Sequence, residues 1–233
     1  MSDEFDRGMP SDHRPVVHLL RIGKTGSTAL VDAFRAADRY SRIRVACHGH
    51  EVTLAQLPPG EPWVFTARDP IDRFVSAFGS RMRCGRPRYD YPHSHAEAIA
   101  FARFTHPHDL GAALDCEDRD LRAEAERAMR SINHVRSSYW DWFENPDTLQ
   151  RRRGECLAML RTRTLDTDAP RLAARLGIPP DRFQLPRAAD TAHRNPPLPP
   201  RPAEVTARSR ANLRGWYAAD YEFLDLADAW FAE

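Results

Sequence analysis

The only lysine in the chain, Lys24, lies in the segment GKTGST at residues 23–28. The small residues of this segment allow the backbone to curl so that several N–H groups point inward, and Thr25, Ser27 and Thr28 add hydroxyl groups. The apolar spacing after Ser27 predicts a helix, with Ser27 as its N-cap. The N-terminus of such a helix favours an anion by about 0.3–1 kcal/mol. The segment therefore predicts a phosphate-binding loop.

A second group of this kind follows the apolar run PWVFTA at 62–67. Arg68 comes directly after the run, and Ser76 lies eight residues further along. Between them, DPIDRFVSAF predicts a helix with Asp69 at the cap and Pro70 in the first turn. An arginine at a strand end offers a planar fork suited to phosphate, and Ser76 lies two turns into the helix. Two neighbouring anion sites predict a ligand with two separated phosphate groups.

A third group follows the run RIRVAC at 42–47, where the sequence CHGHE contains His48 and His50. A histidine with a pKa near 6.5 is suited to act as a base at neutral pH. On extended backbone both rings would lie on one side, and His-x-His recurs at 93–95 and 106–108. Three interpretations of His50 stay open: a general base, a structural or substrate-positioning histidine, and a metal ligand. No carboxylate or cysteine nearby has convincing ligand spacing.

Taken in order, the first two segments resemble the nucleotide-binding segments of sulfotransferases that use 3′-phosphoadenosine 5′-phosphosulfate. The resemblance extends over about residues 15–85. In that family the first segment holds the 5′-phosphosulfate, and an arginine and a serine eight residues apart hold the 3′-phosphate. The matching positions are Lys24, Thr25, Gly26, Ser27 and Thr28 in the first segment, and Arg68 and Ser76 in the second.

The His-Gly-His sequence resembles the uronyl and heparan sulfate 2-O-sulfotransferase branch of that family. The resemblance implies that His50 is the base, with His48 as its neighbour, and that Lys24 stabilises the departing 5′-phosphate. Arg21 also matches an arginine of that branch. Arg194 lies in a late basic loop of the kind that folds over the nucleotide in the family, the alternative being a plain surface loop. The implied acceptor is an alcohol, with a carbohydrate or a glycosylated small molecule first in line, and no metal is required.

Two other functions remain as alternatives. The first is a P-loop-like nucleotide or sugar kinase that uses ATP and magnesium. Its G-x-x-x-x-G-K-[ST] loop would need a glycine where this chain has His18. The second is a non-catalytic nucleotide-binding relative that has lost its acceptor site, against which the presence of Lys24 and His50 argues.

The elements that must position these residues alternate along the chain. Apolar runs at 15–22, 42–47, 62–67 and 156–165 predict strands, and helical spacing follows the first, third and fourth of them. Further helices are predicted at 96–104, 117–132, 203–215 and 217–231. The alternation predicts a P-loop-like three-layer α/β domain with a mostly parallel central sheet. We expect a flexible segment at 1–14, a single domain at 15–233 and acceptor-side helices and loops at 84–155.

The composition excludes several classes of partner. A net charge of +1 argues against general binding to nucleic acid or acidic membranes, so any anion site must be local. No apolar stretch reaches the length needed to span a bilayer. The four cysteines are scattered without a Cys-x-x-Cys pair, which favours reduced thiols in the cytoplasm. The sequence does not indicate an oligomeric state.

Overall fold

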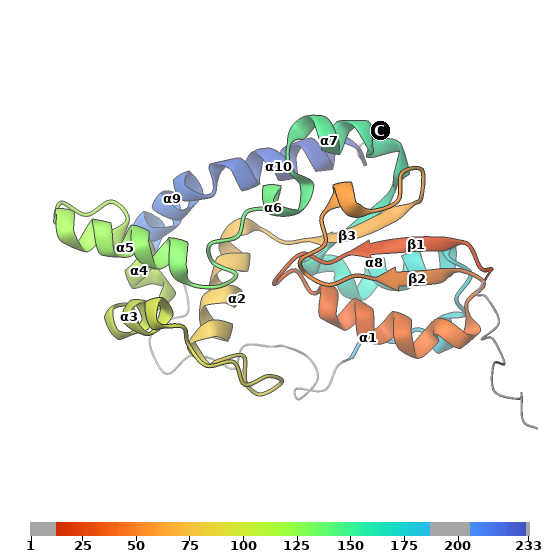
Figure 1. Cartoon of the computed structure of the whole chain (residues 1–233), viewed down its shortest axis with the longest axis horizontal. Helices are drawn as coiled ribbons and strands as arrows, with labels where there is room; N and C mark the ends of the chain where they lie inside the picture. The colour runs from red at the N-terminus through yellow and green to blue at the C-terminus, as the bar shows by residue number, and fades with distance from the viewer. Residues whose placement is uncertain (1–12, 187–205, 232–233) are drawn as a thin grey trace, which may run out of the picture.

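A sheet of four parallel strands forms the centre of the protein (Figure 1). The computed structural model describes residues 13–186 and 206–231. Within these residues the strand order is β2-β1-β3-β4, with helices on both faces, which confirms the predicted three-layer α/β fold. The strands are β1 (Val16–Leu20), β2 (Arg44–Cys47), β3 (Trp63–Ala67) and β4 (Cys156–Arg161).

Helices cover the sheet on both faces, and this explains why its central strands are apolar at successive positions. In β3 all five residues are buried: Val64 packs into one core cluster, and Trp63 and Phe65 pack into another on the opposite face. The first face is covered by α1 (Ser27–Ala37) and α8 (Leu165–Arg175). The second face is covered by α6 (Trp140–Phe143), α7 (Pro146–Arg151) and α10 (Ala218–Ala229).

A second, all-helical part of the protein lies beside the sheet (Figure 1). The helix α2 follows β3 and carries Phe74 and Phe78 into a third core cluster, which the other helices of this part complete. This arrangement leaves α2 between the sheet and the remaining helices. The helices are α2 (Pro70–Met82), α3 (His95–Arg103), α4 (Pro107–Ala113), α5 (Arg119–Ser131) and α9 (Ala207–Trp216).

The predicted fourth strand is too long by four residues. It ends at Arg161, a 3-10 turn occupies Thr162–Thr164, and α8 begins at Leu165. The Thr162 hydroxyl is within hydrogen-bond distance of two carbonyl oxygens, those of Thr25 at 2.8 Å and Ala67 at 3.0 Å. These contacts turn the chain across the ends of the neighbouring strands. The composition of residues 162–165 is typical of a strand and does not reveal this turn.

Of the two predicted helix caps, one is confirmed and the other is wrong. Asp69 caps α2 as expected, because its carboxylate accepts hydrogen bonds from the N–H groups of Ile71 and Asp72. Ser27, by contrast, is the first residue of α1 rather than its cap, and Gly26 takes the cap position with a left-handed φ of 88°. The Ser27 hydroxyl instead donates to the carbonyl of Ile22 at 3.2 Å.

The remaining helix predictions agree with the structure, but the prediction omits three short helices, α4, α6 and α7. The helices predicted at 96–104 and 117–132 correspond to α3 and α5, and those predicted near the end of the chain correspond to α9 and α10. The short helix α4, which starts with Pro107, was not predicted. Residues 1–12 of the predicted flexible segment lie outside the described residues.

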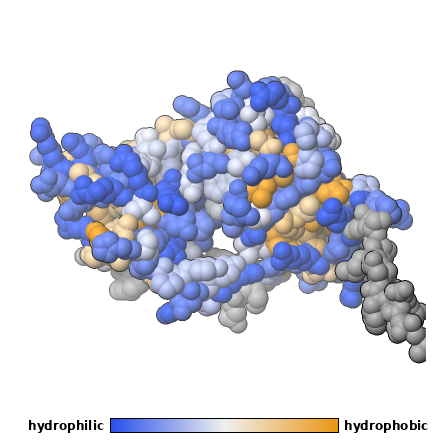
Figure 2. Space-filling view, in the orientation of Figure 1, coloured by the Kyte–Doolittle hydropathy of each residue, from blue (hydrophilic) through white to orange (hydrophobic). Residues whose placement is uncertain are grey.

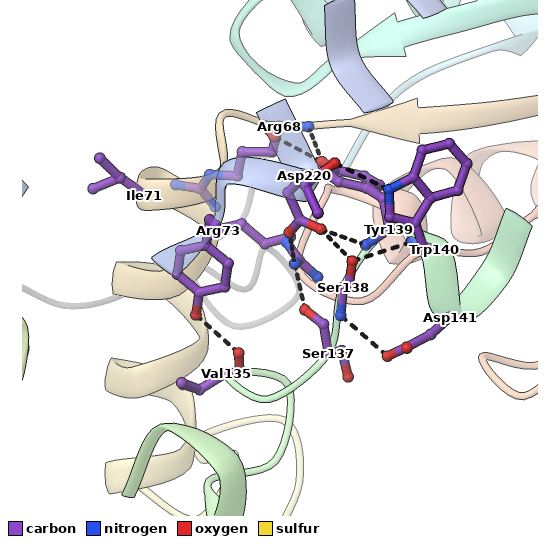
Figure 3. A network of polar contacts seen from close by, with 12 residues as sticks. Arg68, Ile71, Arg73, Val135, Ser137, Ser138, Tyr139, Trp140, Asp141 and Asp220 are labelled. Atoms are coloured by element: carbon purple, nitrogen blue, oxygen red, sulfur yellow. Dashed lines mark hydrogen bonds and ion pairs between the residues drawn. The ribbon is translucent and has the colours of Figure 1, made fainter. Parts of the chain in front are cut away.

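A buried ion pair joins α2 to α10 (Figure 3). Arg73 donates from Nη2 to the Asp220 carboxylate at 2.6 Å, and both side chains are at most 2% exposed. Asp220 also accepts from the Ser138 hydroxyl at 2.5 Å and from the Tyr139 N–H at 2.8 Å. The Arg73 guanidinium lies 4.8 Å from the centre of the Tyr139 ring. One carboxylate thus connects two helices and the segment between α5 and α6.

We expect Asp220→Asn to lower the free energy of unfolding by about 3–5 kcal/mol, because it leaves the buried Arg73 cation without its counter-charge. Urea denaturation at neutral pH measures this change. The matched control is Asp225→Asn, at an exposed position of the same helix, which we expect to change stability by less than about 0.5 kcal/mol. Equal effects of the two substitutions would contradict the central role of the ion pair.

Candidate anion-binding cavity

A cavity of about 1020 Å³ opens where the four strands end, between the sheet and the helical part of the protein. Figure 2 shows the surface hollowed at this place. Ligands of open α/β sheets bind outside the carboxyl ends of the strands. The cavity brings together eight of the residues predicted for the site: Arg21, Lys24, Gly26, Ser27, Thr28, His50, Arg68 and Ser76.

Two predicted site residues do not line the cavity, and a third is outside the described residues. Thr25 is fully buried beneath the loop. Its hydroxyl donates to the carbonyl of Ile22 at 2.8 Å and forms a 2.5 Å hydrogen bond with the hydroxyl of Thr66, so it braces the loop rather than facing the cavity. His48 does not line the cavity. Arg194 lies outside the described residues.

The loop before α1 curls as a phosphate loop should. Lys24 and Gly26 have left-handed backbone conformations, with φ of 67° and 88°, and such turns direct N–H groups into one concavity. The cavity wall includes the first residues of α1, which are Ser27, Thr28 and Ala29, and the Ala29 N–H donates to the Gly26 carbonyl at 3.1 Å. The N-terminus of the helix favours an anion at this wall. Gly26 is required here on two grounds: its φ is positive, and a Cβ would lie 3.0 Å from Leu165.

Positive charge dominates the cavity wall. Its charged lining comprises four cations, Arg21, Lys24, Arg68 and Arg81, and one carboxylate, Asp166. Arg81 is neutralised by the buried Glu97, to which it donates two hydrogen bonds of 2.7 and 2.8 Å. Arg21, Lys24 and Arg68 form no ion pair with any carboxylate in the part of the chain that the structure describes. Their combined field favours an anion.

Lys24 is held in an unfavourable environment for a cation. Burial, together with the nearby positive charges of Arg68 and Arg83, lowers the pKa of Lys24 to about 8. The ammonium group is therefore charged at neutral pH and becomes neutral in mild alkali. A bound anion would supply the missing counter-charge.

The backbone of Arg68 is fixed by a tyrosine from another part of the chain. The buried hydroxyl of Tyr139 donates to the carbonyl of Arg68 at 2.7 Å and accepts from its N–H at 2.8 Å (Figure 3). The Arg68 guanidinium reaches the carbonyl of Lys24 at 3.5 Å, so the two cations approach the same part of the cavity. Ser76, on α2, lines the cavity as well.

The partners of His50 assign its tautomer. Nδ1 lies 3.1 Å from the carbonyl oxygen of Arg21, which only accepts, so Nδ1 carries the proton. Nε2 lies 3.3 Å from the Arg21 guanidinium, which only donates, so Nε2 presents its lone pair. Burial and the charge of Arg21 lower the pKa of His50, although the hydrogen bond to the Arg21 carbonyl opposes them. His50 is therefore a neutral imidazole with an unprotonated Nε2.

His48 belongs to a different group of side chains. Its Nε2 forms a 2.7 Å hydrogen bond with Nδ1 of His18, and Nε2 of His18 lies 2.5 Å from the Glu61 carboxylate. The expectation that His48 and His50 share one side of extended backbone is wrong, because β2 ends at Cys47 and the chain turns directly afterwards. His48 still contributes its carbonyl, which accepts from Arg21 at 3.3 Å.

The sequence prediction missed the part of the cavity wall that the helical part of the protein contributes. His134 and Asn133 come from the segment after α5, and Tyr89 and Tyr91 come from the segment between α2 and α3. His134 lies edge-on to His50, with 6.2 Å between ring centres. The only sequence signal was an Asn-His pair just beyond the predicted helix at 117–132, and nothing in its spacing connects it to Lys24.

The segment that carries the two tyrosines is connected to α1 by an ion pair. Arg88 donates two hydrogen bonds to the Asp32 carboxylate, of 2.7 and 3.1 Å. This bidentate pair joins the helical part of the protein to the first helix behind the phosphate loop. It therefore holds Tyr89 and Tyr91 at the cavity wall.

The described residues contain neither a candidate metal site nor a helix that could span a membrane. Nowhere in residues 13–186 and 206–231 do three or more histidine, cysteine, aspartate or glutamate side chains converge as a metal site would require. Within the same ranges, every helix is too short or too polar to cross a bilayer.

Comparison with known proteins adds no family to these observations. No protein-family model matches the sequence, and no curated protein matches it. The function must therefore be inferred from the cavity and its residues.

We expect the affinity of the cavity for inorganic sulfate to fall about tenfold between about pH 7 and about pH 9. Sulfate keeps its charge over this range, whereas the Lys24 ammonium, with a pKa of about 8, loses its proton. Calorimetric titration at several pH values measures the change. Lys24→Arg is the control, because an arginine stays charged throughout and the profile should flatten. The same slope in both proteins would exclude Lys24 as the titrating group.

Proposed function

We propose that the protein is a sulfotransferase that transfers the sulfuryl group of 3′-phosphoadenosine 5′-phosphosulfate to the hydroxyl of an alcohol. The observation that carries this proposal is the pairing of a neutral histidine base with a lysine-bearing phosphate loop in one cavity. His50 supplies the base, and Lys24 supplies the cation. A second anion position at Arg68 and Ser76 in the same cavity fits a nucleotide with two separated phosphates.

The two anion positions divide the nucleotide between them. The loop amides, Lys24 and the N-terminus of α1 would hold the 5′-phosphosulfate. Arg68 and Ser76 would hold the 3′-phosphate, since a guanidinium and a hydroxyl both donate to phosphate oxygens. The resemblance of these segments to phosphosulfate-dependent sulfotransferases supports the same division.

The reaction is an in-line displacement at sulfur. Nε2 of His50 takes the proton of the acceptor hydroxyl as the acceptor oxygen forms a bond to sulfur. The bond between sulfur and the 5′-phosphate oxygen breaks, and its electron pair stays on the phosphate. Lys24 and the loop amides stabilise the charge that develops there. The products are a sulfate ester, 3′,5′-adenosine bisphosphate and a proton on His50.

The site also accounts for the choice of lysine in an otherwise arginine-only chain. A slim ammonium group approaches the bridging oxygen as a point charge, whereas a wide guanidinium fits there poorly. The Arg21 contact to Nε2 of His50, at 3.3 Å, is longer than the usual 2.7–2.9 Å of charged hydrogen bonds. Breaking this contact, so that Nε2 of His50 can accept from the acceptor hydroxyl instead, therefore costs little free energy.

For the acceptor, we propose a carbohydrate or a glycosylated small molecule. Tyr89 and Tyr91 line the cavity with their rings 5.4 Å apart. Tyrosine combines an apolar face with a polar tip, which suits a sugar ring bearing hydroxyl groups.

The first test is calorimetric titration of 3′,5′-adenosine bisphosphate without metal. We expect binding that weakens at least about tenfold in both Lys24→Ala and Arg68→Ala, because each substitution removes a charge-assisted hydrogen bond of about 1.5–3 kcal/mol. Arg171→Ala, at an exposed position of α8, is the matched control and should bind normally. Binding of ATP with magnesium alone would contradict the two-phosphate assignment and indicate a kinase.

The second test is turnover with labelled phosphosulfate and a panel of alcohols. We expect His50→Asn to lower kcat by about 10²–10⁴-fold, because it removes the base, while its affinity for the bisphosphate stays within about twofold of wild type. Bisphosphate binding without turnover on any acceptor would contradict the enzyme assignment and favour a nucleotide-binding protein.

A further inference from the structure

His134 is a second histidine in the cavity, and it comes from the segment that follows α5. Its ring packs directly against Gly23, where a Cβ would lie 2.9 Å from Nδ1. The same ring lies edge-on to His50 at 6.2 Å. His134 therefore lies beside both the lysine-bearing loop and the base, although 110 residues separate it from Lys24 in the sequence.

The backbone holds His134 in a conformation that few side chains adopt. Its φ is 64°, in the left-handed region, where strain is commonly associated with function. Hydrogen bonds fix the chain on both sides: the Asn133 N–H donates to Glu97 at 3.0 Å, and the Val135 carbonyl accepts from Tyr217 at 2.8 Å. The strained conformation directs the ring to the cavity wall.

The His134 ring is available to a ligand. In residues 13–186 and 206–231 neither of its ring nitrogens forms a hydrogen bond. The hydrogen bond of this residue is made by its backbone N–H, which donates to the Asn133 side chain at 2.9 Å. Burial and the positive charge of Lys24 lower the pKa of His134 to about 4. At neutral pH the ring is uncharged, so it offers one N–H donor without repelling the ammonium group.

We propose that His134 is a further catalytic residue, whose ring N–H donates a hydrogen bond to the sulfuryl group during its transfer. This inference rests on the proposed sulfotransferase function. In an in-line displacement the attacking oxygen, near His50, and the leaving oxygen, near Lys24, lie on opposite sides of sulfur. The other sulfuryl oxygens project sideways between them, and His134 is a neutral donor that borders both His50 and the loop that carries Lys24.

The sulfuryl transfer does not use the proton of His134. The acceptor proton moves to Nε2 of His50, the new O–S bond forms, and the bond from sulfur to the phosphate oxygen breaks with its electrons on the phosphate. His134 keeps its own proton throughout. Its hydrogen bond shortens as charge develops on the sulfuryl oxygens, which is how a positioned neutral donor lowers a barrier.

Nuclear magnetic resonance of the full chain with ¹⁵N-labelled histidine tests this contact directly. The His134 ring signals are assigned by their loss in His134→Asn, a residue that tolerates the left-handed backbone. We expect 3′-phosphoadenosine 5′-phosphosulfate to shift the His134 N–H nitrogen relative to the complex with 3′,5′-adenosine bisphosphate, because only the former carries the sulfuryl group. His95, which is exposed on α3, should give the same signal in both complexes.

Turnover of the variant supplies the second readout, measured as release of labelled sulfate from the phosphosulfate to water. We expect His134→Asn to lower this rate by about 10²-fold, as for loss of one preorganised donor, and to keep its bisphosphate affinity within about twofold. His95→Asn is the control and should match wild type. Identical His134 signals in both complexes, with an unchanged rate, would overturn the role of His134 alone. Failure of both nucleotides to bind would overturn it together with the proposed function.

Discussion

The cavity depends on the buried contact between Arg73 and Asp220. These two side chains, almost without exposure, join α2 to α10, and Asp220 also holds the N–H of Tyr139. Tyr139 in turn fixes both backbone polar groups of Arg68, at the point where β3 ends. A buried carboxylate is tolerated only when its hydrogen-bonding capacity is filled, and here Arg73 of α2 and the segment of Ser138 and Tyr139 fill it. The ion pair thus fixes the relation between the sheet and the helical part.

Within this frame, uncompensated positive charge is concentrated at one place. The chain as a whole is close to neutral, yet Arg21, Lys24 and Arg68 line the same cavity. Burial, together with the positive charges of Arg68 and Arg83, opposes the charged state of Lys24 and lowers its pKa. Such an arrangement costs stability in the empty protein, and a bound polyanion would remove that cost. The distribution of charge therefore favours the anion-bound protein over the empty protein.

Three histidines of the protein have different protonation and contacts because their neighbouring groups differ. His50 lies between a carbonyl and a guanidinium, which leaves Nε2 unprotonated. His48, two residues away, is connected through His18 to Glu61 and faces a different set of groups. His134 has a ring without a protein hydrogen bond in the described part of the chain, beside the phosphate loop. These three histidines therefore lie in three distinct chemical environments.

The sequence by itself determined the elements whose causes are local. Apolar runs predicted four strands, Asp69 and Pro70 marked the start of α2, and GKTGST placed Lys24 at a strand end. Such features follow from hydrogen bonding and burial within a few residues. Only the tertiary structure decided the rest: the end of β4 at Arg161, because Thr162 bonds to carbonyls of two distant segments, and the arrival of His134 beside His50. These contacts join residues far apart in the chain, so no local pattern encodes them.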